Sequence, residues 1–349
     1  MNLDSPKVSV IIPMYNTVKY ISTCIESVMI QSLKEIEIIV IDDCSTDDSY
    51  EFVRKNYCDS SSGKYDPRIK LFQNLRNVGA GLSRNRGIEI ASGKYLQFVD
   101  SDDAITETML EILYNRAEEN DLDVLYVNSL LAAKDPNFKL NSQIAIDKHF
   151  CYQNKPRQIS NNIIDRIQRE FIGSGLWWMP VVKLIRRELL TKNHIYFPNM
   201  FSGEDMLLQL ATFFFIKKAE LIDGGYYVYR YRAESITHTP NDKYLRETVL
   251  SYSEALRYMR ELWKKLPIEF SRENQILLET FVVYGLMKMH CSDRGMSLTE
   301  IDKILEEVTR DSNSIDPAVT KAIIQYMIHS TRWMNLKDRN KTPLISLKS

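Results

Sequence analysis

The first 130 residues alternate between short apolar runs and longer amphipathic runs, and this alternation constrains the fold more than any other feature. Strands that are apolar on both faces and are separated by helices are typical of a parallel α/β sheet, because helices then cover both faces. The five predicted strands cover residues 7–15, 36–43, 69–74, 95–100 and 123–132. The predicted helices between them cover residues 18–31, 45–57, 81–92 and 107–120.

The rest of the chain has a different pattern. Residues 133–160 are polar and are predicted to be an irregular or crossing segment, and residues 161–232 mix helices with a strand pair around "GGYYVYRYR". Beyond residue 240 the pattern is only helical, so the best boundary lies there. The predicted division is an α/β domain over 1–239, with halves at about 1–132 and 133–239, and a helical region over 240–349.

Composition excludes several classes of protein. The chain has 45 basic and 46 acidic side chains, a formal net charge of −1, so no basic excess exists for binding nucleic acid. Its five cysteines are scattered without a CxxC pair, which favours a reducing cytoplasm. The N-terminus has no signal pattern, and the apolar runs are shorter than the roughly 20 residues of a membrane span. We therefore expect a cytoplasmic protein, with peripheral contact at the inner face of the cell membrane left open.

Carboxylates gather where the predicted strands end. Asp42 and Asp43 end the second strand, and Asp100, Asp102 and Asp103 follow the fourth. Ligands of an open parallel sheet bind outside the carboxyl ends of its strands. Crowded carboxylates repel one another unless they are solvated or a positive charge lies between them. Because oxygen ligands suit Mg²⁺ or Mn²⁺, the cluster predicts a phosphate bound through a metal ion at the edge of the sheet where these strands end. We call this edge the rim.

Two common phosphate-binding motifs are absent. No GxxxxGK[ST] loop occurs in the sequence. The stretch "VGAGLSRNRG" contains Gly-Ala-Gly, but it lacks a third glycine at the right offset and does not follow the first strand. The remaining interpretation is a nucleotide whose diphosphate is neutralised mainly by the metal.

Five stretches, in order, carry a family resemblance: "VSVIIPMYN", "IIVIDDCSTDDS", "NVGAGLSRNRG", "YLQFVDSDD" and "GEDMLL". Together they resemble the family 2 glycosyltransferases of the GT-A fold over residues 7–235. The resemblance implies a Rossmann-like, mostly parallel sheet flanked by helices, with a C-terminal helical extension. It also implies an inverting transfer from a nucleotide-sugar, usually a UDP-sugar, to an acceptor hydroxyl in bacterial polysaccharide or glycan synthesis.

The same resemblance implies roles for residues of the nucleotide-sugar half, which covers about residues 1–132. Pro13 and Tyr15 would border the base, and Asp43 would bind the uracil ring. Asn77 and Arg84 lie in the segment that borders the nucleotide.

The acidic segment, which is Asp100 to Asp103, would contact the sugar and the phosphates. By the same resemblance Asp100 faces the ribose and Asp102 holds Mn²⁺ or Mg²⁺, with Asp103 as the alternative metal ligand. Cys44 departs from the family, which often has Gly or Asn at that position.

In the acceptor half, which covers about residues 133–239, the resemblance implies that Asp205 is the catalytic base, with Glu204 beside it at the substrate. Ser202 to Asp205 also fits a capping box in front of an apolar helix, and one aspartate can hardly do both. His238 resembles a place where some relatives add a metal ligand, although a lone histidine is more often structural.

Other functions and partners stay open at this point. A sugar nucleotidyltransferase needs a glycine-rich basic loop after the first strand, which "PMYNTVKY" lacks, and a non-catalytic scaffold on the same fold is a further alternative. The expected partners are a nucleotide-sugar donor and a glycan or lipid-linked glycan acceptor. The apolar stripe at 323–328 and the basic end at 332–348 predict packing on the domain or on a second subunit, with membrane contact as a secondary role.

Overall fold

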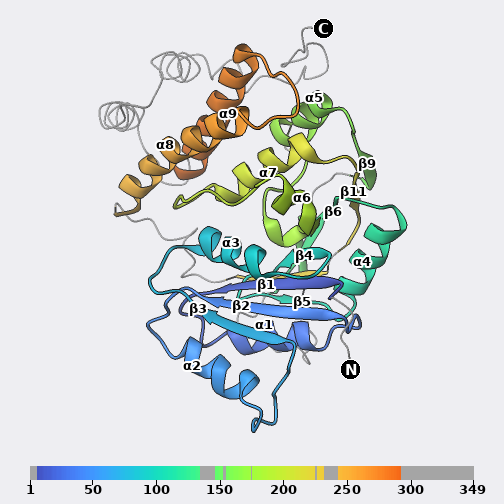
Figure 1. Ribbon diagram of the computed structural model, residues 1–349, viewed down its shortest axis with the longest axis vertical. Coiled ribbons are helices and arrows are strands. Elements are labelled where there is room, and N and C mark those ends of the chain that lie inside the picture. Colours follow the sequence, from blue (N-terminus) through green and yellow to red (C-terminus); the bar gives the residue numbers. More distant parts are fainter. Residues whose placement is uncertain are drawn as a thin grey trace. The chain divides into compact units, whose positions relative to one another are not determined.

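The computed structural model describes residues 6–133, 146–151, 155–173, 175–224, 226–231 and 243–291 (Figure 1). The chain forms two compact units, and each unit is made of segments that are not consecutive in the sequence. The first unit contains residues 1–161, 176–197 and 215–239, and the second contains residues 162–175, 198–214 and 240–349. The functional division predicted at residue 239 stays a prediction.

The first unit is built on an eight-stranded sheet with the order β3-β2-β1-β4-β10-β6-β11-β9. β9 and β10 run opposite to the other strands, so the sheet is mostly parallel, as predicted. β1 and β2 are buried along their whole length, which fits their apolar sequences. The strands are β1 (Val8–Met14), β2 (Ile36–Asp42), β3 (Ile69–Gln73), β4 (Tyr95–Phe98), β6 (Val124–Val127), β9 (Arg157–Ile159), β10 (Lys183–Arg186) and β11 (Ala219–Ile222).

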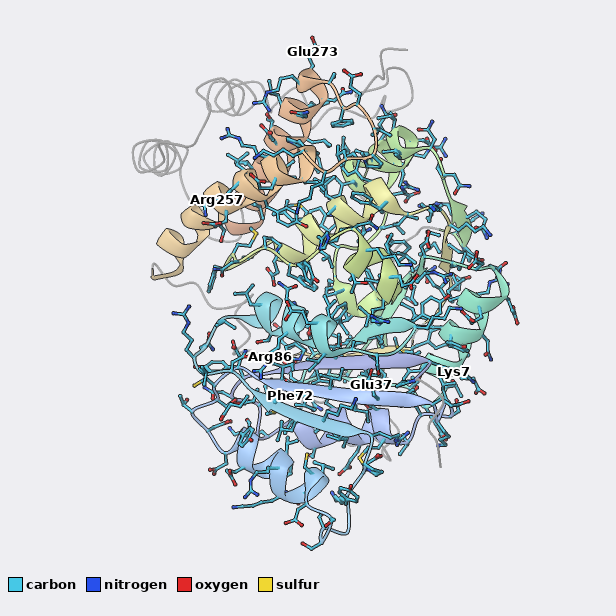
Figure 2. The ribbon with its side chains drawn as sticks, in the orientation of Figure 1. Lys7, Glu37, Phe72, Arg86, Arg257 and Glu273 are labelled. Carbon is cyan, nitrogen blue, oxygen red and sulfur yellow. The ribbon has the colours of Figure 1, made fainter. Side chains whose placement is uncertain are left out.

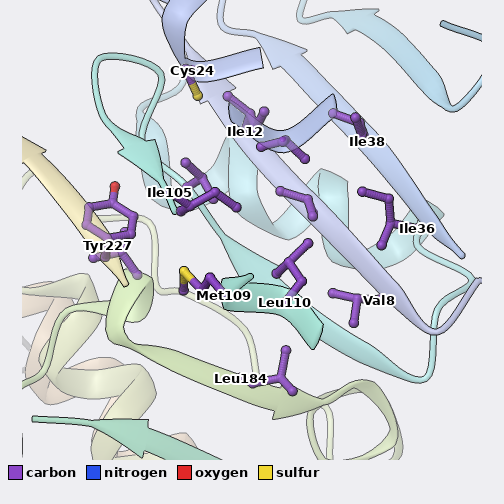
Figure 3. Close-up of a cluster of buried hydrophobic side chains, with 14 of the residues drawn as sticks. Val8, Ile12, Cys24, Ile36, Ile38, Ile105, Met109, Leu110, Leu184 and Tyr227 are labelled. Carbon is purple, nitrogen blue, oxygen red and sulfur yellow. The ribbon is translucent and has the colours of Figure 1, made fainter. Parts of the chain in front are cut away.

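Helices cover both faces of this sheet. On one face, alternate side chains of β1 and β2, such as Val8 and Ile36, pack with Met109 and other side chains of α1, α2 and α4 (Figure 3). On the other face α3 lies so close to β1 that a Cβ atom at Gly87 would clash with Cγ2 of Ile11. The helical elements of this unit are α1 (Ile21–Met29), α2 (Ser49–Val53), the π-helical turn η1 (Arg54–Cys58), α3 (Ala80–Ile90), α4 (Met109–Glu119), the 3₁₀ turn η3 (Pro180–Val182) and α6 (Arg187–Lys192).

A buried carboxylate joins the amino ends of three strands. Glu37 of β2, labelled in Figure 2, is 3% exposed. It accepts hydrogen bonds from Ser9 Oγ of β1 at 2.6 Å and from Lys70 Nζ of β3 at 2.7 Å. It also accepts one from the main-chain N–H of Ser92 at 2.7 Å. Burial would raise the pKa of Glu37, but the donors Lys70, Ser9 and Ser92 together lower it to about 2. The side chain is therefore ionised in the folded protein.

A second sheet of four strands has the order β5-β12-β7-β8. The prediction of one strand over 123–132 is wrong, because the chain divides at Asn128 into β6 of the main sheet and β7 of this one. The prediction of a strand pair around 224–232 is also wrong, since β11 pairs with β6 while β12 pairs with β5 and β7. The strands are β5 (Ala104–Ile105), β7 (Ser129–Ala133), β8 (Ile146–Cys151) and β12 (Tyr227–Arg230).

The segment 133–160, predicted to be irregular, contains β8 and β9. β9 is the edge strand of the main sheet and pairs with β11 in the antiparallel direction. Arg157 and Gln158 are polar, and with Ile159 they make a strand here because β11 supplies the hydrogen-bonding partner, which local composition does not reveal.

The second unit is helical in its described part. The buried carboxylate of Glu279, in α9 (Arg272–Cys291), accepts a hydrogen bond at 2.8 Å from Nε1 of Trp263, the last residue of α8 (Lys243–Trp263). The helical pattern predicted beyond residue 240 is confirmed for 243–291, while the predicted stripe and basic end lie outside the described residues. In the described part of the chain, no helix is both long and apolar enough to span a bilayer. The elements are α5 (Ile163–Arg166), the π-helical turn η2 (Ile167–Ile172), α7 (Glu204–Phe215), α8 (Lys243–Trp263) and α9 (Arg272–Cys291).

Candidate active site

The strand order of the main sheet reverses between β1 and β4. The chain runs from β1 outward to β2 and β3, and it then returns to place β4 on the other side of β1. β1 pairs with β2 as far as Met14 but with β4 only as far as Ile11. Ile11 accepts a hydrogen bond from Val99 on the β4 side, and Pro13, two residues on, faces the same side. Its missing N–H thus costs no ladder bond, and ligands of such sheets bind at this kind of reversal.

The Asp43 carboxylate orders the turn between β3 and α3. Oδ1 accepts hydrogen bonds from Asn74 Nδ2 at 2.8 Å and from the Val78 N–H at 3.0 Å, and Oδ2 accepts one from the Gly79 N–H at 2.8 Å. Gly79 has φ +91°, where glycine is favoured. The carboxylate is buried, and the exposed Asn77 lies on the turn that it holds. Binding of a uracil ring by Asp43 stays a prediction.

The loop after β2 is docked on the loop after β1. Asn16 has φ +53°, its Oδ1 accepts a hydrogen bond from the Thr46 N–H at 2.8 Å, and its N–H donates to Ser45 Oγ at 3.0 Å. Because Ser45 and Thr46 are bonded to Asn16, the helix predicted from residue 45 begins only at Ser49. Tyr15, which precedes Asn16, is 44% exposed at the rim.

Arg84 of α3 reaches the first residue of the acidic segment. Its Nη2 lies 2.9 Å from Asp100 Oδ1, and its guanidinium lies 5.4 Å from the ring centroid of Phe197. The Phe197 main chain is fixed by reciprocal hydrogen bonds to the Asn85 side chain at 2.8 and 2.9 Å. Arg84 is therefore held between an aromatic ring and a carboxylate.

Asp103 is buried and points towards β12. Its Oδ2 accepts a hydrogen bond from Tyr227 Oη at 2.7 Å, and its Oδ1 accepts one from the Arg230 N–H at 2.8 Å. Burial raises the pKa of Asp103 well above its ordinary value, and the charges of Asp102 and Asp100 raise it further. Because both carboxylate oxygens are hydrogen-bonded inside the protein, Asp103 fits a metal site poorly, and Asp102 is the better candidate.

Asp102 is only partly buried, and its carbonyl oxygen accepts a hydrogen bond from Arg230 Nε at 2.6 Å. The buried guanidinium of Arg230 lies 5.1 Å from the ring centroid of Tyr20. Arg84 and Arg230 thus place positive charge beside the acidic segment, which explains how three carboxylates stand together at a strand end. Among the described residues, no group of three His, Cys, Asp or Glu side chains forms a ready metal site.

Glu204 and Asp205 begin α7 in the second unit. The carbonyl of Gly203 accepts the first intrahelical bond, from the Leu207 N–H at 3.3 Å, and Gly203 has φ +89°. Gly203 is therefore the N-cap residue, and Ser202 precedes it. The capping box expected from Ser202 to Asp205 is out of register by one residue. Asp205 as the base stays a prediction, and His238 lies outside the described residues.

Three residues of this rim were not predicted from the sequence. Asn74 donates to both Asp43 and Ser83 Oγ and accepts a hydrogen bond from Arg86 Nη1, whose guanidinium lies 5.6 Å from the ring centroid of Phe72 (Figure 2). The other two, Tyr227 and Arg230, lie in the Tyr/Arg-rich strand β12. The composition of that strand was the one available indication, since buried Tyr and Arg side chains need polar partners.

Comparison with known proteins identifies the family. The sequence matches the profile of glycosyl transferase family 2 over residues 9–197. Glycosyltransferase GlyG of Streptococcus pneumoniae is 32% identical over 255 residues, which cover 72% of this chain and 80% of that protein. The cholesterol galactosyltransferase of Borreliella burgdorferi is 29% identical over 276 residues, which cover 76% of this chain and 73% of that protein.

A solved structure shows the same fold. S. aureus TarS 1-349 in complex with UDP-GlcNAc has a TM-score of 0.63 to this chain at 23% sequence identity, and the match covers 95% of this chain and 89% of that chain. The likeness confirms the predicted GT-A architecture of a large, mostly parallel sheet flanked by helices. With the matched profile and the relative 32% identical, it follows that this chain belongs to glycosyl transferase family 2 and is a glycosyltransferase.

Proposed function

We propose that this enzyme transfers a sugar, with inversion, from a nucleotide-diphosphate sugar to an acceptor hydroxyl. One observation carries the proposal: the acidic segment stands where the strand order reverses between β1 and β4, with Asp103 bonded inward and Asp102 partly exposed. A diphosphate beside these carboxylates would be repelled unless a cation lay between them. Family membership sets aside the nucleotidyltransferase and scaffold alternatives.

The residues at the rim fit a divalent ion. The side chain of Asp100 is 38% exposed and that of Asp102 is also partly exposed, and both offer the oxygen donors that Mn²⁺ and Mg²⁺ prefer. We therefore assign the ion to Asp102, with Asp100 beside it. When bound, the ion would supply charge stabilisation for the departing diphosphate.

The protein's own side chains would do the rest. Tyr15 and Asn77 are exposed at the rim and are available to the nucleotide. Arg84 keeps Asp100 in place through their ion pair. Asp205 would take the proton of the acceptor hydroxyl as it attacks the anomeric carbon opposite the leaving group. A single displacement of this kind inverts the configuration and needs no enzyme nucleophile.

UDP is the first nucleotide to test, because a solved structure of the same fold contains UDP-GlcNAc. A glycan or a lipid-linked glycan is the proposed acceptor, and the relative named cholesterol galactosyltransferase makes a lipid acceptor worth including. A lipid acceptor would bring the enzyme to the inner face of a membrane, so peripheral contact belongs to this proposal.

Calorimetry of UDP binding with Mn²⁺ and with chelator tests the proposal. We expect the dissociation constant to rise at least tenfold in chelator, and Asp102→Asn to bind as weakly with Mn²⁺ as the native protein does without it. Asp59→Asn, at an exposed aspartate outside the rim, is the matched control. Equal affinity with and without metal would overturn the metal-bridged site. Hydrolysis of a panel of UDP-sugars then ranks the donors.

A further inference from the structure

One hydroxyl group joins the two ends of the acidic segment. Tyr227 Oη accepts a hydrogen bond from the Asp100 N–H at 3.0 Å and donates one to Asp103 Oδ2 at 2.7 Å. The Asp103 N–H in turn donates to the Asp100 carbonyl at 3.0 Å. The segment is thereby closed into a ring through the side chain of a residue that lies far away in the sequence.

Arg230, three residues further along β12, holds the same segment at two more points. Its main-chain N–H donates to Asp103 Oδ1 at 2.8 Å, and its Nε donates to the Asp102 carbonyl at 2.6 Å. The side chain is 2% exposed, and its guanidinium lies over Tyr20. Burial of this guanidinium lowers the pKa of Arg230, while the carboxylates of Asp103 and Asp102 favour its charged form.

The strand that carries both residues is firmly placed. β12 pairs with β5 through Tyr227 and Ile105 and with β7 through Val228 and Leu131. Tyr227 is 2% exposed and packs in the hydrophobic core, where Figure 3 shows it with Ile105. Because β12 is paired with a strand on each side, Tyr227 and Arg230 are held in place, and they in turn hold the groups that they bind.

None of the contacts from β12 described above uses the side chain of Asp102. They hold the main chain at Asp100 and Asp102 and the carboxylate of Asp103, so they fix where the Asp102 side chain starts. Burying a tyrosine hydroxyl, an arginine and an aspartate costs free energy unless each is paired. Tyr227, Arg230 and Asp103 therefore form a buried hydrogen-bonded network next to the partly exposed Asp102 side chain.

We propose that Tyr227 and Arg230 are positioning residues that, together with Asp103, set the direction of the Asp102 carboxylate and thereby the affinity of the site for a divalent ion. This inference rests on the proposed function and deepens it. Groups that orient a metal ligand typically change metal affinity by about 10–100-fold when they are removed. The sequence distance between β4 and β12 is bridged because β5 brings the chain back beside β12.

Tyr227→Phe removes only the hydroxyl, and Tyr226→Phe removes the hydroxyl of its partly buried neighbour as a matched control. UDP binding to the full chain is measured by calorimetry over a Mn²⁺ titration and in chelator, with the melting temperature recorded in parallel. For Tyr227→Phe we expect the Mn²⁺-dependent gain in UDP affinity to fall about tenfold, while UDP affinity in chelator stays at the native value. Tyr226→Phe should behave as the native protein does.

The outcomes separate the two proposals. If the native protein gains no UDP affinity from Mn²⁺, the proposed metal site fails and this inference fails with it. If the native protein gains affinity and Tyr227→Phe gains as much, this inference alone is overturned. Should Tyr227→Phe not fold, Arg230→Lys decides, because it keeps the charge and the main-chain bond to Asp103 but loses the Nε donor to the Asp102 carbonyl. An unchanged Mn²⁺-dependent gain in Arg230→Lys would then overturn the inference.

Discussion

Arg84 and Asp100 form an ion pair in which only the arginine is buried: Nη2 and Oδ1 are 2.9 Å apart, and the side chains are 6% and 38% exposed. The guanidinium also lies against Phe197, whose ring packs edge-on against Phe98 with the centroids 5.5 Å apart. The arginine is thus fixed by packing, while the carboxylate is partly exposed. Arg84 therefore sets the position of Asp100 rather than the reverse.

Arg84→Gln should destabilise the protein by about 1–3 kcal/mol, because Asp100 loses its partner beside Asp102 and Asp103. Urea denaturation of the metal-free protein measures this change. A double-mutant cycle tests its cause, since Asp100→Asn should cost less in the Arg84→Gln background than in the native one. Equal costs in the two backgrounds would show that the pair is not coupled.

The four strands β1 to β4 could be predicted because their sequences are mostly apolar and turn signals bound them. The position of β10 could not be predicted, since it enters between β4 and β6 in the antiparallel direction and its local sequence does not name its neighbours. The division at Asn128 was missed for a similar reason. The apolar pattern continues across it, and only pairing with two different sheets separates β6 from β7.

The rim itself could be predicted, because the carboxyl ends of parallel strands meet at one edge. The different roles of Asp100, Asp102 and Asp103 could not, since their side chains are chemically alike. Burial and partners distinguish them, and those partners come from α3 and β12, which lie elsewhere in the chain. The capping box near Ser202 was a false match of spacing, because the helix begins one residue later than that motif requires.

Cys44 occupies a backbone conformation that favours glycine and that asparagine tolerates. Its φ is +60°, in the left-handed region, which costs a residue other than glycine roughly 1–2 kcal/mol and which asparagine tolerates better. Cys44→Asn should therefore raise the free energy of unfolding by up to about 1 kcal/mol. Cys44→Ser, which keeps both the size and the strain, should leave it unchanged, and Cys44→Val should lower it. A loss of stability in Cys44→Asn would contradict this account.

Glu37→Gln should destabilise the fold in a pH-dependent way. The pKa of Glu37 is lowered from 4.5 to about 2, so its stabilising effect is complete above about pH 4.5 and is lost as the pH falls through 2. Near pH 7 we expect a loss of about 1.5–3 kcal/mol, as for hydrogen bonds to a charged group.

Melting temperatures of the native protein and Glu37→Gln, taken from pH 7 down to pH 2, should converge towards the acid end. Glu35→Gln is the matched control, because Glu35 pairs with Lys7 at the surface and such pairs contribute at most about 1 kcal/mol. A difference between Glu37→Gln and the native protein that stays constant with pH would show that the lost stability does not come from the ionised carboxylate.

Asp205→Asn should abolish most transfer while it spares both the fold and the donor site. Gly203 is the N-cap of α7, so Asp205 is the second helical residue and is not the third, which a capping box requires. An acid at a helix N-terminus is favourably placed, and this placement typically contributes about 0.3–1 kcal/mol. As the general base for the acceptor hydroxyl, its loss should slow transfer by about 10²–10⁴-fold.

Transfer rates, UDP affinity with Mn²⁺ and melting temperature are measured together for this variant. Ser202→Ala is the control, because a working capping box would lose about 1 kcal/mol on that change, whereas we expect a smaller loss and normal transfer. If Asp205→Asn keeps its turnover but melts well below the native protein, Asp205 serves the helix and the base must be sought elsewhere. If it loses turnover and UDP affinity together, Asp205 acts on the donor, and its assignment to the acceptor hydroxyl is wrong.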